Sequence, residues 1–84
     1  IHVTVPSLRL DAIISSSWNL SRQDSQKLIE SDNVKVNWEP IGKVSKEVAK
    51  GDLVSTRGYG RFILYSIEGI NRKGRIKIKI RLLR

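Results

Sequence analysis

The sequence has no cysteine and only one histidine, and these absences limit the chemistry it can perform. Without cysteine there is no disulfide, no thiolate metal ligand and no thiol nucleophile. His2 lies near one end of the chain, where we expect a frayed terminus, and a lone histidine cannot build a multi-histidine metal site. The eight Asp and Glu residues are scattered and match no catalytic motif. We therefore expect neither an enzyme nor a metal or cofactor site.

Long apolar runs are absent as well. No stretch approaches the roughly 20 apolar residues of a membrane span. Residues 1–10 have no basic head followed by an apolar block, so they do not read as a cleavable signal. An initiating Met is also missing, which suggests a piece of a longer protein. The chain has 84 residues, 39% hydrophobic and 29% charged, which predicts one modest globular domain, monomeric within a larger chain.

Acidic residues are scarce relative to basic ones. Sixteen Lys and Arg face eight Asp and Glu, which leaves a formal net charge of +8. Such an excess attracts polyanions, above all nucleic acid, with acidic protein surfaces and anionic membranes as the alternatives. Charge thus indicates a class of partner but not the surface that binds it.

The first part of the chain has a helical apolar period. It is carried by Leu10, Ile13, Ile14 and Trp18. Pro6-Ser7 precedes this run as a plausible start, with Ser7 as a candidate N-cap. The segment 19–21 then breaks the helix.

A second helix is predicted from Arg22 to about Glu30. Ser21 followed by Asp24 resembles a capping box, with Asp in place of the usual Glu. We expect this helix to bury Leu28 and Ile29.

From Val34 the apolar period changes to two. Val34, Val36 and Trp38 alternate with polar residues, which predicts a half-buried strand. Both Trp18 and Trp38 fall on apolar faces, so we expect both in the core. Turn-forming residues divide the next part of the chain into strands at 53–57 and 61–67, with turns at 39–42, 50–52, 58–60 and 71–74.

The last segment alternates most regularly. Its apolar residues are Ile76, Ile78, Ile80 and Leu82, and its cations are Lys77, Lys79 and Arg81. Such a strand buries its isoleucines and presents the cations on its other face. The cations either protect an edge strand from aggregation or face phosphates, and their regularity slightly favours protection. Two helices followed by about four strands predict an α+β fold, with the helices packed on a mostly antiparallel sheet.

Three places could bind a polyanion. Arg9 and Asp11 can be explained as an ordinary solvated pair, with the acid favourable in a first helical turn. Arg22 is unfavourable in a first turn unless an anion offsets it, so a functional and an ordinary role are equally weighted. Tyr59, flanked by glycines at a hairpin tip beside Arg57 and Arg61, is the one aromatic expected to be exposed for base stacking.

Five segments together follow one known pattern. They are Arg9-Leu10-Asp11, Leu20-Ser21-Arg22, Lys27-Leu28-Ile29, Val34-Lys35-Val36-Asn37 and Lys50-Gly51-Asp52. Their order and spacing over about residues 8–57 resemble the S4-type RNA-binding domain. Three further features are most similar to photosystem II S4-domain proteins and their bacterial cell-division-associated relatives. They are Asn37-Trp38, the segment Gly58-Tyr59-Gly60-Arg61 and the basic last strand, the latter two within the basic C-terminal strands of residues 58–84.

The resemblance implies one S4-like domain over residues 1–84, with two N-terminal helices on a small curved sheet. It implies binding of structured RNA, such as ribosomal RNA on the ribosome, without catalysis, in the cytoplasm or the plastid stroma. A docking module for acidic proteins or membranes remains the alternative, and delivery of RNA to an enzyme elsewhere in a longer chain a third possibility.

The pattern also nominates site residues. By position it nominates Arg9, Ser21, Arg22, Lys27, Asn37 and Lys50 for RNA, to which the hairpin adds Arg57, Tyr59 and Arg61. A supporting basic surface would consist of Lys35, Lys77, Lys79 and Arg81. Asp11 matches as a structural cap or as an orienting partner for an arginine. Asp32 and Trp38 stand where the pattern usually has glycine; Asp tolerates a left-handed turn, whereas Trp38 argues against close approach of RNA to the backbone there.

Overall fold

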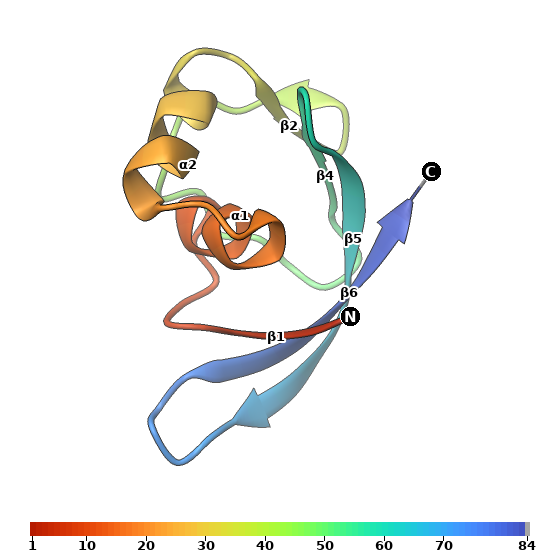
Figure 1. The fold of residues 1–84 in the computed structure, drawn as a ribbon. Coiled ribbons are helices and arrows are strands. Elements are labelled where there is room, and N and C mark those ends of the chain that lie inside the picture. The colour runs from red at the N-terminus through yellow and green to blue at the C-terminus, as the bar shows by residue number, and fades with distance from the viewer. Residues whose placement is uncertain (84) are drawn as a thin grey trace.

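Two helices pack against a six-stranded sheet (Figure 1). Apolar side chains from the helices and the sheet meet in one core. The computed structural model describes residues 1–83. Its elements are β1 (His2–Val5), α1 (Leu10–Trp18), α2 (Arg22–Glu30), β2 (Val34–Val36), β3 (Glu39–Pro40), β4 (Leu53–Thr56), β5 (Gly60–Ile70) and β6 (Ile76–Leu83). The strand order is β1-β6-β5-β4-β2-β3 and every pairing is antiparallel. The predicted α+β class is confirmed.

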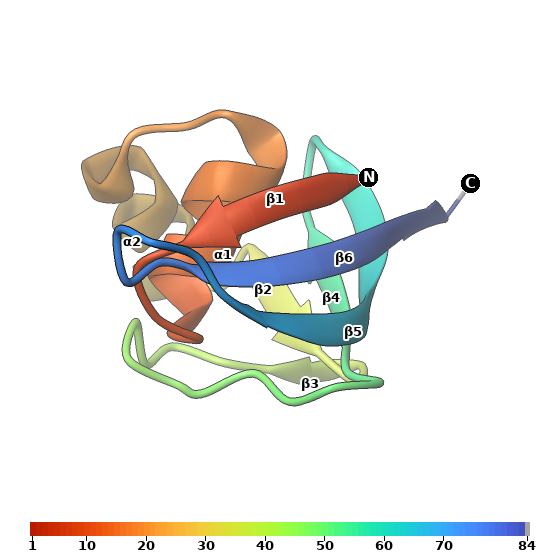
Figure 2. The same cartoon turned by 90° about the horizontal axis from the view of Figure 1, so that it is seen from below.

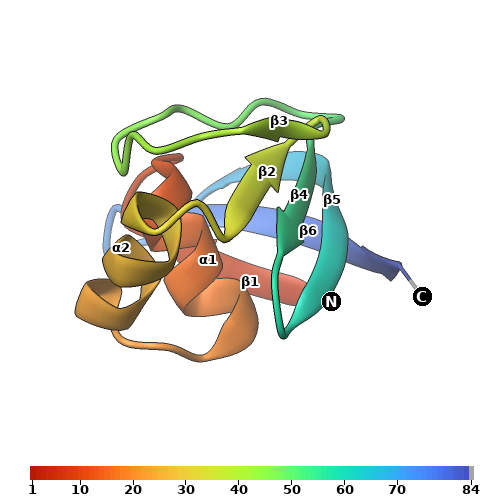
Figure 3. The same cartoon turned by 90° about the horizontal axis from the view of Figure 1, so that it is seen from above.

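The sheet curves around α1, as the views from below and above show (Figures 2 and 3). Leu10, Ile13 and Ile14 of α1 and Ile29 of α2 fill the concave side. The strands contribute Val5, Val34, Val36, Val54, Phe62, Leu64, Ile78 and Ile80. The opposite face of the sheet, which we call the outer face, carries polar and charged side chains together with the apolar pair Leu53 and Ile63. Among residues 1–83, no helix has the length and hydropathy that crossing a bilayer requires.

The start of α1 differs from the prediction. Ser7 is not its N-cap: Arg9 holds that position and makes no side-chain cap. Instead the backbone amides of Leu10 and Asp11 donate to the carbonyl oxygens of Lys46 (2.8 Å) and Val44 (3.2 Å). A segment more than 30 residues away therefore satisfies the first amides of the helix.

Helix α2 follows its local signals closely. It spans Arg22–Glu30 as predicted, and the Ser21 hydroxyl accepts from the Asp24 amide at 3.0 Å. Ile29 is buried and Leu28 is half-buried against the core. Asp32 follows with a φ of 62°, the left-handed conformation expected where glycine is usual.

Trp38 and its neighbours depart from the predicted strand. Asn37 and Trp38 both have positive φ, 52° and 67°, and form the two-residue turn of a hairpin that joins β2 to β3. The turn ends the alternation that Val34 and Val36 had set. Trp38 is therefore 59% exposed and not in the core, and Glu39–Pro40 is a strand and not a turn.

The prediction of a frayed start was also wrong. His2 lies in β1 opposite Lys79, and its Nδ1 is 3.1 Å from Glu68 Oε1. Strand β1 therefore covers one side of β6, while β5 covers the other.

The last strand is confirmed in pattern and corrected in position. Ile78 and Ile80 are buried and the cations project from the other face, although Leu82 is 43% exposed. Strand β1 pairs with residues 76–79 of β6, so Arg81 lies beyond the part that β1 covers. Lys77 and Lys79 are flanked by β1 and β5 and do not protect an edge of the sheet. They stand in the interior of the outer face.

Two isoleucines of the β5–β6 hairpin test where the stability of the fold resides. Ile78 is 1% exposed and Ile70 is 69% exposed. We expect Ile78→Ala to lower the free energy of unfolding by about 2–5 kcal/mol, because it leaves a cavity. Ile70→Ala should cost less than about 0.5 kcal/mol. Urea denaturation followed by circular dichroism measures both, and equal losses would contradict this placement of the core.

Candidate functional site

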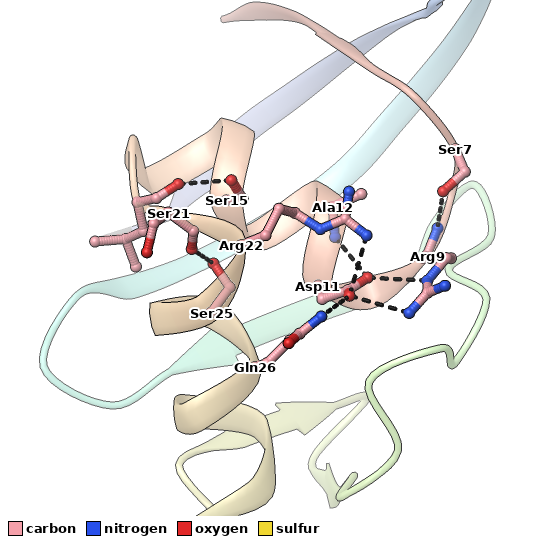
Figure 4. Close-up of polar contacts among 10 residues, drawn as sticks. Ser7, Arg9, Asp11, Ala12, Ser15, Ser21, Arg22, Ser25 and Gln26 are labelled. Carbon is pink, nitrogen blue, oxygen red and sulfur yellow. Dashed lines mark hydrogen bonds and ion pairs between the residues drawn. The ribbon is translucent and has the colours of Figure 1, made fainter.

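A fully buried carboxylate lies between the two helices (Figure 4). Asp11 has 0% exposure and accepts hydrogen bonds from both helices. Arg9 donates to it through Nε and Nη2, both at 3.1 Å, and Arg22 through Nη2 at 3.1 Å. Gln26 Nε2 donates at 2.9 Å, as does the Ala12 amide. Asp11 thus joins α1 to α2 and brings two arginines to one point.

The pKa of Asp11 lies below the ordinary value for aspartate. Burial alone raises the pKa of the carboxyl, because it disfavours the charged form. The hydrogen bonds from Gln26, Arg22 and Arg9, together with the charge of Arg22, lower the pKa by more than burial raises it. Asp11 is therefore ionised at neutral pH.

The same cluster explains why Arg22 is tolerated in a first helical turn. An external anion was one way to offset its unfavourable interaction with the helix dipole. The structure supplies an internal anion, Asp11, at 3.1 Å. The side chains of Arg9 and Arg22 are each 42% exposed, so both reach the surface while one side of each is fixed.

A shallow groove of about 260 Å³ lies on another side of α2. It is lined by Asp24, Lys27, Leu28, Ser31 and Tyr59. Tyr59 is 47% exposed, as predicted, and its ring lies 6.0 Å from that of Trp18. It is not the one exposed aromatic, since Trp38 and Tyr65 are 59% and 51% exposed. Trp18 is half-buried against the core, where its Nε1 donates to Thr56 Oγ1 at 3.2 Å. Lys27 and Tyr59 therefore line the same groove although they are distant in the sequence.

Comparison with known proteins gives this arrangement a family. The sequence profile of the S4 domain matches residues 8–54, more than half of the chain. The chain belongs to the S4 domain family.

Two relatives of this S4 domain can be named. It is 47% identical over 75 residues to ribosome-associated protein quality control protein P2 of Bacillus subtilis (strain 168), covering 89% of the chain and 29% of that protein. A crystal structure of a pseudouridylate synthase superimposes with a TM-score of 0.60 at 28% identity, covering 74% of this chain and 26% of that one. The chain thus spans under a third of the length of either protein.

Two of the nominated residues have structural tasks in this S4 domain. The Ser21 hydroxyl caps α2. The side-chain Nδ2 of Asn37 donates to Asp52 Oδ1 at 3.0 Å, and its Oδ1 accepts from the Leu53 backbone amide at 2.9 Å. These two hydrogen bonds fix the turn at residues 50–52. Lys50 lies exposed in that turn.

The remaining nominated cations lie on the sheet and its turns, away from Asp11. Lys35, Ser55 and Arg61 face one another across β2, β4 and β5 on the outer face. Arg57 follows β4 in the turn before Tyr59. Lys77, Lys79 and Arg81 continue the outer face along β6, so the helical and sheet candidates form two separate surfaces.

Sequence reasoning missed two residues. Gln26 lies four residues after Arg22, one helical turn on, so a search for polar partners at that spacing finds it. The exposure of Trp38 depends on the two-residue turn, for which Asn-Trp is not a usual signal. Among residues 1–83, no group of three or more His, Asp or Glu side chains is placed to hold a metal ion.

The lowered pKa of Asp11 predicts a pH-dependent contribution to stability. A carboxyl whose folded pKa is below its unfolded value of about 3.9 stabilises the fold above that value and loses the contribution as pH falls through the folded pKa. At pH 7 we expect Asp11→Asn to lower the free energy of unfolding by about 1–3 kcal/mol, as for a lost charged hydrogen-bond partner. The gap from the wild type should be constant above about pH 5 and shrink below about pH 4.

Denaturant titrations across this pH range measure the gap. Asp32→Asn is the matched control, because Asp32 is exposed and Asn tolerates the same left-handed backbone. Its stability should stay within about 0.5 kcal/mol of the wild type at pH 7. A gap for Asp11→Asn that stays constant down to pH values near 2 would be inconsistent with an ionised, stabilising carboxylate.

Proposed function

We propose that this S4 domain is a non-catalytic module that binds structured RNA, such as ribosomal RNA, through phosphates and shape. The observation that carries the proposal is the pair of arginines, Arg9 and Arg22, held at the surface by the buried carboxylate of Asp11. The net charge of +8 supplies the long-range attraction.

The donors of the two arginines suit phosphate. A guanidinium has five N–H donors in a planar fork. Asp11 accepts bonds from two nitrogens of Arg9 and one of Arg22, and no other acceptor among residues 1–83 takes a bond from either side chain. The remaining donors can therefore bind phosphate oxygens. Because Asp11 already orders both side chains, less conformational entropy is lost on binding than for free arginines.

The kind of RNA follows from groove geometry. In A-form RNA the major groove is deep and narrow, so side chains reach phosphates and 2′-hydroxyls more easily than base edges. Two fixed arginines on one side of α2, and Lys27 and Tyr59 on another, offer firm positions for such contacts. The ribosome association in the name of the Bacillus subtilis relative supports a ribosomal setting. The likeness to a pseudouridylate synthase covers about a quarter of that enzyme and does not carry its activity to this chain.

Arg22 tests the proposed surface directly. We expect Arg22→Ala to reduce affinity for a structured RNA hairpin several-fold, about 5-fold or more for a lost charge-assisted bond, with the domain still folded. Arg72→Ala removes the same charge from an exposed turn of the β5–β6 hairpin and is the matched control. Fluorescence anisotropy measures both, and equal losses would reduce the proposal to non-specific attraction.

Salt dependence reports how many phosphates are engaged. If about five are contacted, log affinity should fall with log salt at a slope of about −3.5 to −4.5. Anionic vesicles serve as the competing polyanion. Retention on vesicles equal to that on RNA would favour a module for acidic surfaces instead.

Asp11 separates orientation from net charge. Asp11→Asn removes a negative charge, so electrostatics alone predicts tighter binding to RNA. We expect weaker binding, by about 3- to 10-fold, because Arg9 and Arg22 lose the carboxylate that orients them. Glu68→Gln, which changes the charge equally at an exposed position of β5, should bind as well as the wild type or slightly better. Tighter binding by Asp11→Asn would refute the orienting role.

A further inference from the structure

Trp38 occupies a position that does not suit a tryptophan on structural grounds. Its φ of 67° is left-handed, a conformation that favours glycine or asparagine in a two-residue hairpin turn. Its large apolar side chain is 59% exposed and is not part of the core cluster. The residue thus strains the backbone and exposes apolar surface, and its side chain adds nothing to the core. Among residues 1–83 the other non-glycine residues with positive φ are Asn or Asp, which tolerate that conformation, so Trp38 is the outlier. A strained exposed residue of this kind is a feature of functional positions.

A hollow of about 380 Å³ lies beside the indole ring. It is lined by Asp32, Asn33, Lys35, Trp38, Ser55 and Arg57. The guanidinium carbon of Arg61 lies 5.4 Å from the centre of the Trp38 ring, a cation–π contact that supports the indole. An exposed aromatic ring is therefore surrounded by three cations, Lys35, Arg57 and Arg61.

The register of the sheet produces this hollow. Lys35 of β2, Ser55 of β4 and Arg61 of β5 are cross-strand neighbours on the outer face. Ser55 is the smallest of the three and leaves space between two long cationic side chains. The turn that carries Trp38 is fixed because the Asn37 side chain is bonded to Asp52 and Leu53. The indole is therefore positioned before any ligand arrives.

We propose that this hollow binds an unpaired nucleotide of RNA, with its base stacked on Trp38 and its phosphates at Lys35, Arg57 and Arg61. The proposal rests on the proposed RNA-binding function and adds a second surface to it. Aromatic side chains stack on any base, and neighbouring cations track the backbone of a single strand. The helical arginines instead suit phosphates of a folded duplex. A protein partner fits less well, because the hollow is lined mainly by polar and cationic side chains.

The test uses three RNA probes with the same duplex. One is blunt, one carries a short single-stranded overhang on each strand, and one carries an abasic overhang of the same length. The wild type should bind the overhang probe more tightly than the abasic probe, because only the former offers bases. Stacking predicts a difference of about 5- to 100-fold.

Trp38→Gly removes the ring and relieves the backbone. It should abolish the preference for the overhang probe while leaving affinity for the blunt and abasic probes unchanged. Because glycine adopts positive φ without strain, the melting temperature should rise by a few degrees, about 2–6 °C. Loss of binding therefore cannot arise from unfolding. Trp38→Tyr keeps an aromatic ring and should retain most of the preference.

The outcomes separate this proposal from the proposed function. Equal affinity of the wild type for the overhang and abasic probes, with blunt-duplex binding still dependent on Arg22, overturns the Trp38 site and leaves the helical site standing. No binding to any probe overturns RNA binding itself. A preference that survives Trp38→Gly also overturns the stacking role.

Discussion

The Asp11 carboxylate has no exposed surface, and a buried charge of this kind is costly unless it is fully bonded. Its bonds come from Arg9 and Ala12 around the start of α1 and from Arg22 and Gln26 of α2. The two helices must therefore adopt one relative orientation, because any other leaves the carboxylate without its partners. The same requirement draws two arginines together at the surface, although like charges would otherwise repel. A structural constraint and the proposed binding surface thus share one set of contacts.

The sheet completes what the helices begin. The carbonyl oxygens of Val44 and Lys46 satisfy the first amides of α1, so the loop before β4 is part of the support for Asp11. Strand β1 pairs with β6 and forms one end of the sheet, and β3 forms the other end. Helix α1 lies between these two ends of the curved sheet (Figure 2). With β6 inside the sheet, its cations add to the outer face beside those of β2 and β5. The nominated cations are therefore divided between a helical surface and a sheet surface.

Local signals predicted the elements whose causes are local. The Ser21 cap and the apolar spacing of α2 lie within a few residues of each other, and the helix bounds were correct. The alternation in β6 is equally self-contained, and Ile78 and Ile80 are buried as expected. The order of the family segments correctly predicted membership of the S4 domain family.

Most misses have long-range causes, although the error at Trp38 arises from its own two-residue turn. Ser7 does not cap α1, because carbonyl groups more than 30 residues away accept hydrogen bonds from the first amides of the helix. Strand β1 has only four residues and pairs with residues 76–79, so the sequence around His2 contains no local signal that predicts the strand. Strand order decides which strand is an edge, and alternation within β6 carries no information about its neighbours. The sequence predicted Asp11 as a possible orienting partner for an arginine. It did not predict that α2 supplies two of the partners of Asp11, Arg22 and Gln26.

The two surfaces achieve a fixed geometry by different physical means. On the helices, an ion-pair cluster orders Arg9 and Arg22, and the energy lost on burying Asp11 is recovered in its bonds. On the sheet, Trp38 is held by a strained turn, a bonded Asn37 and the overlying Arg61. The first suits a ligand of regular shape and dense charge, since its donors are aimed and immobile. The second suits a flat, uncharged group beside a phosphate, since its ring is exposed and its cations are peripheral. Folded RNA with an unpaired nucleotide contains both kinds of group, so the two proposed surfaces call for a single ligand class.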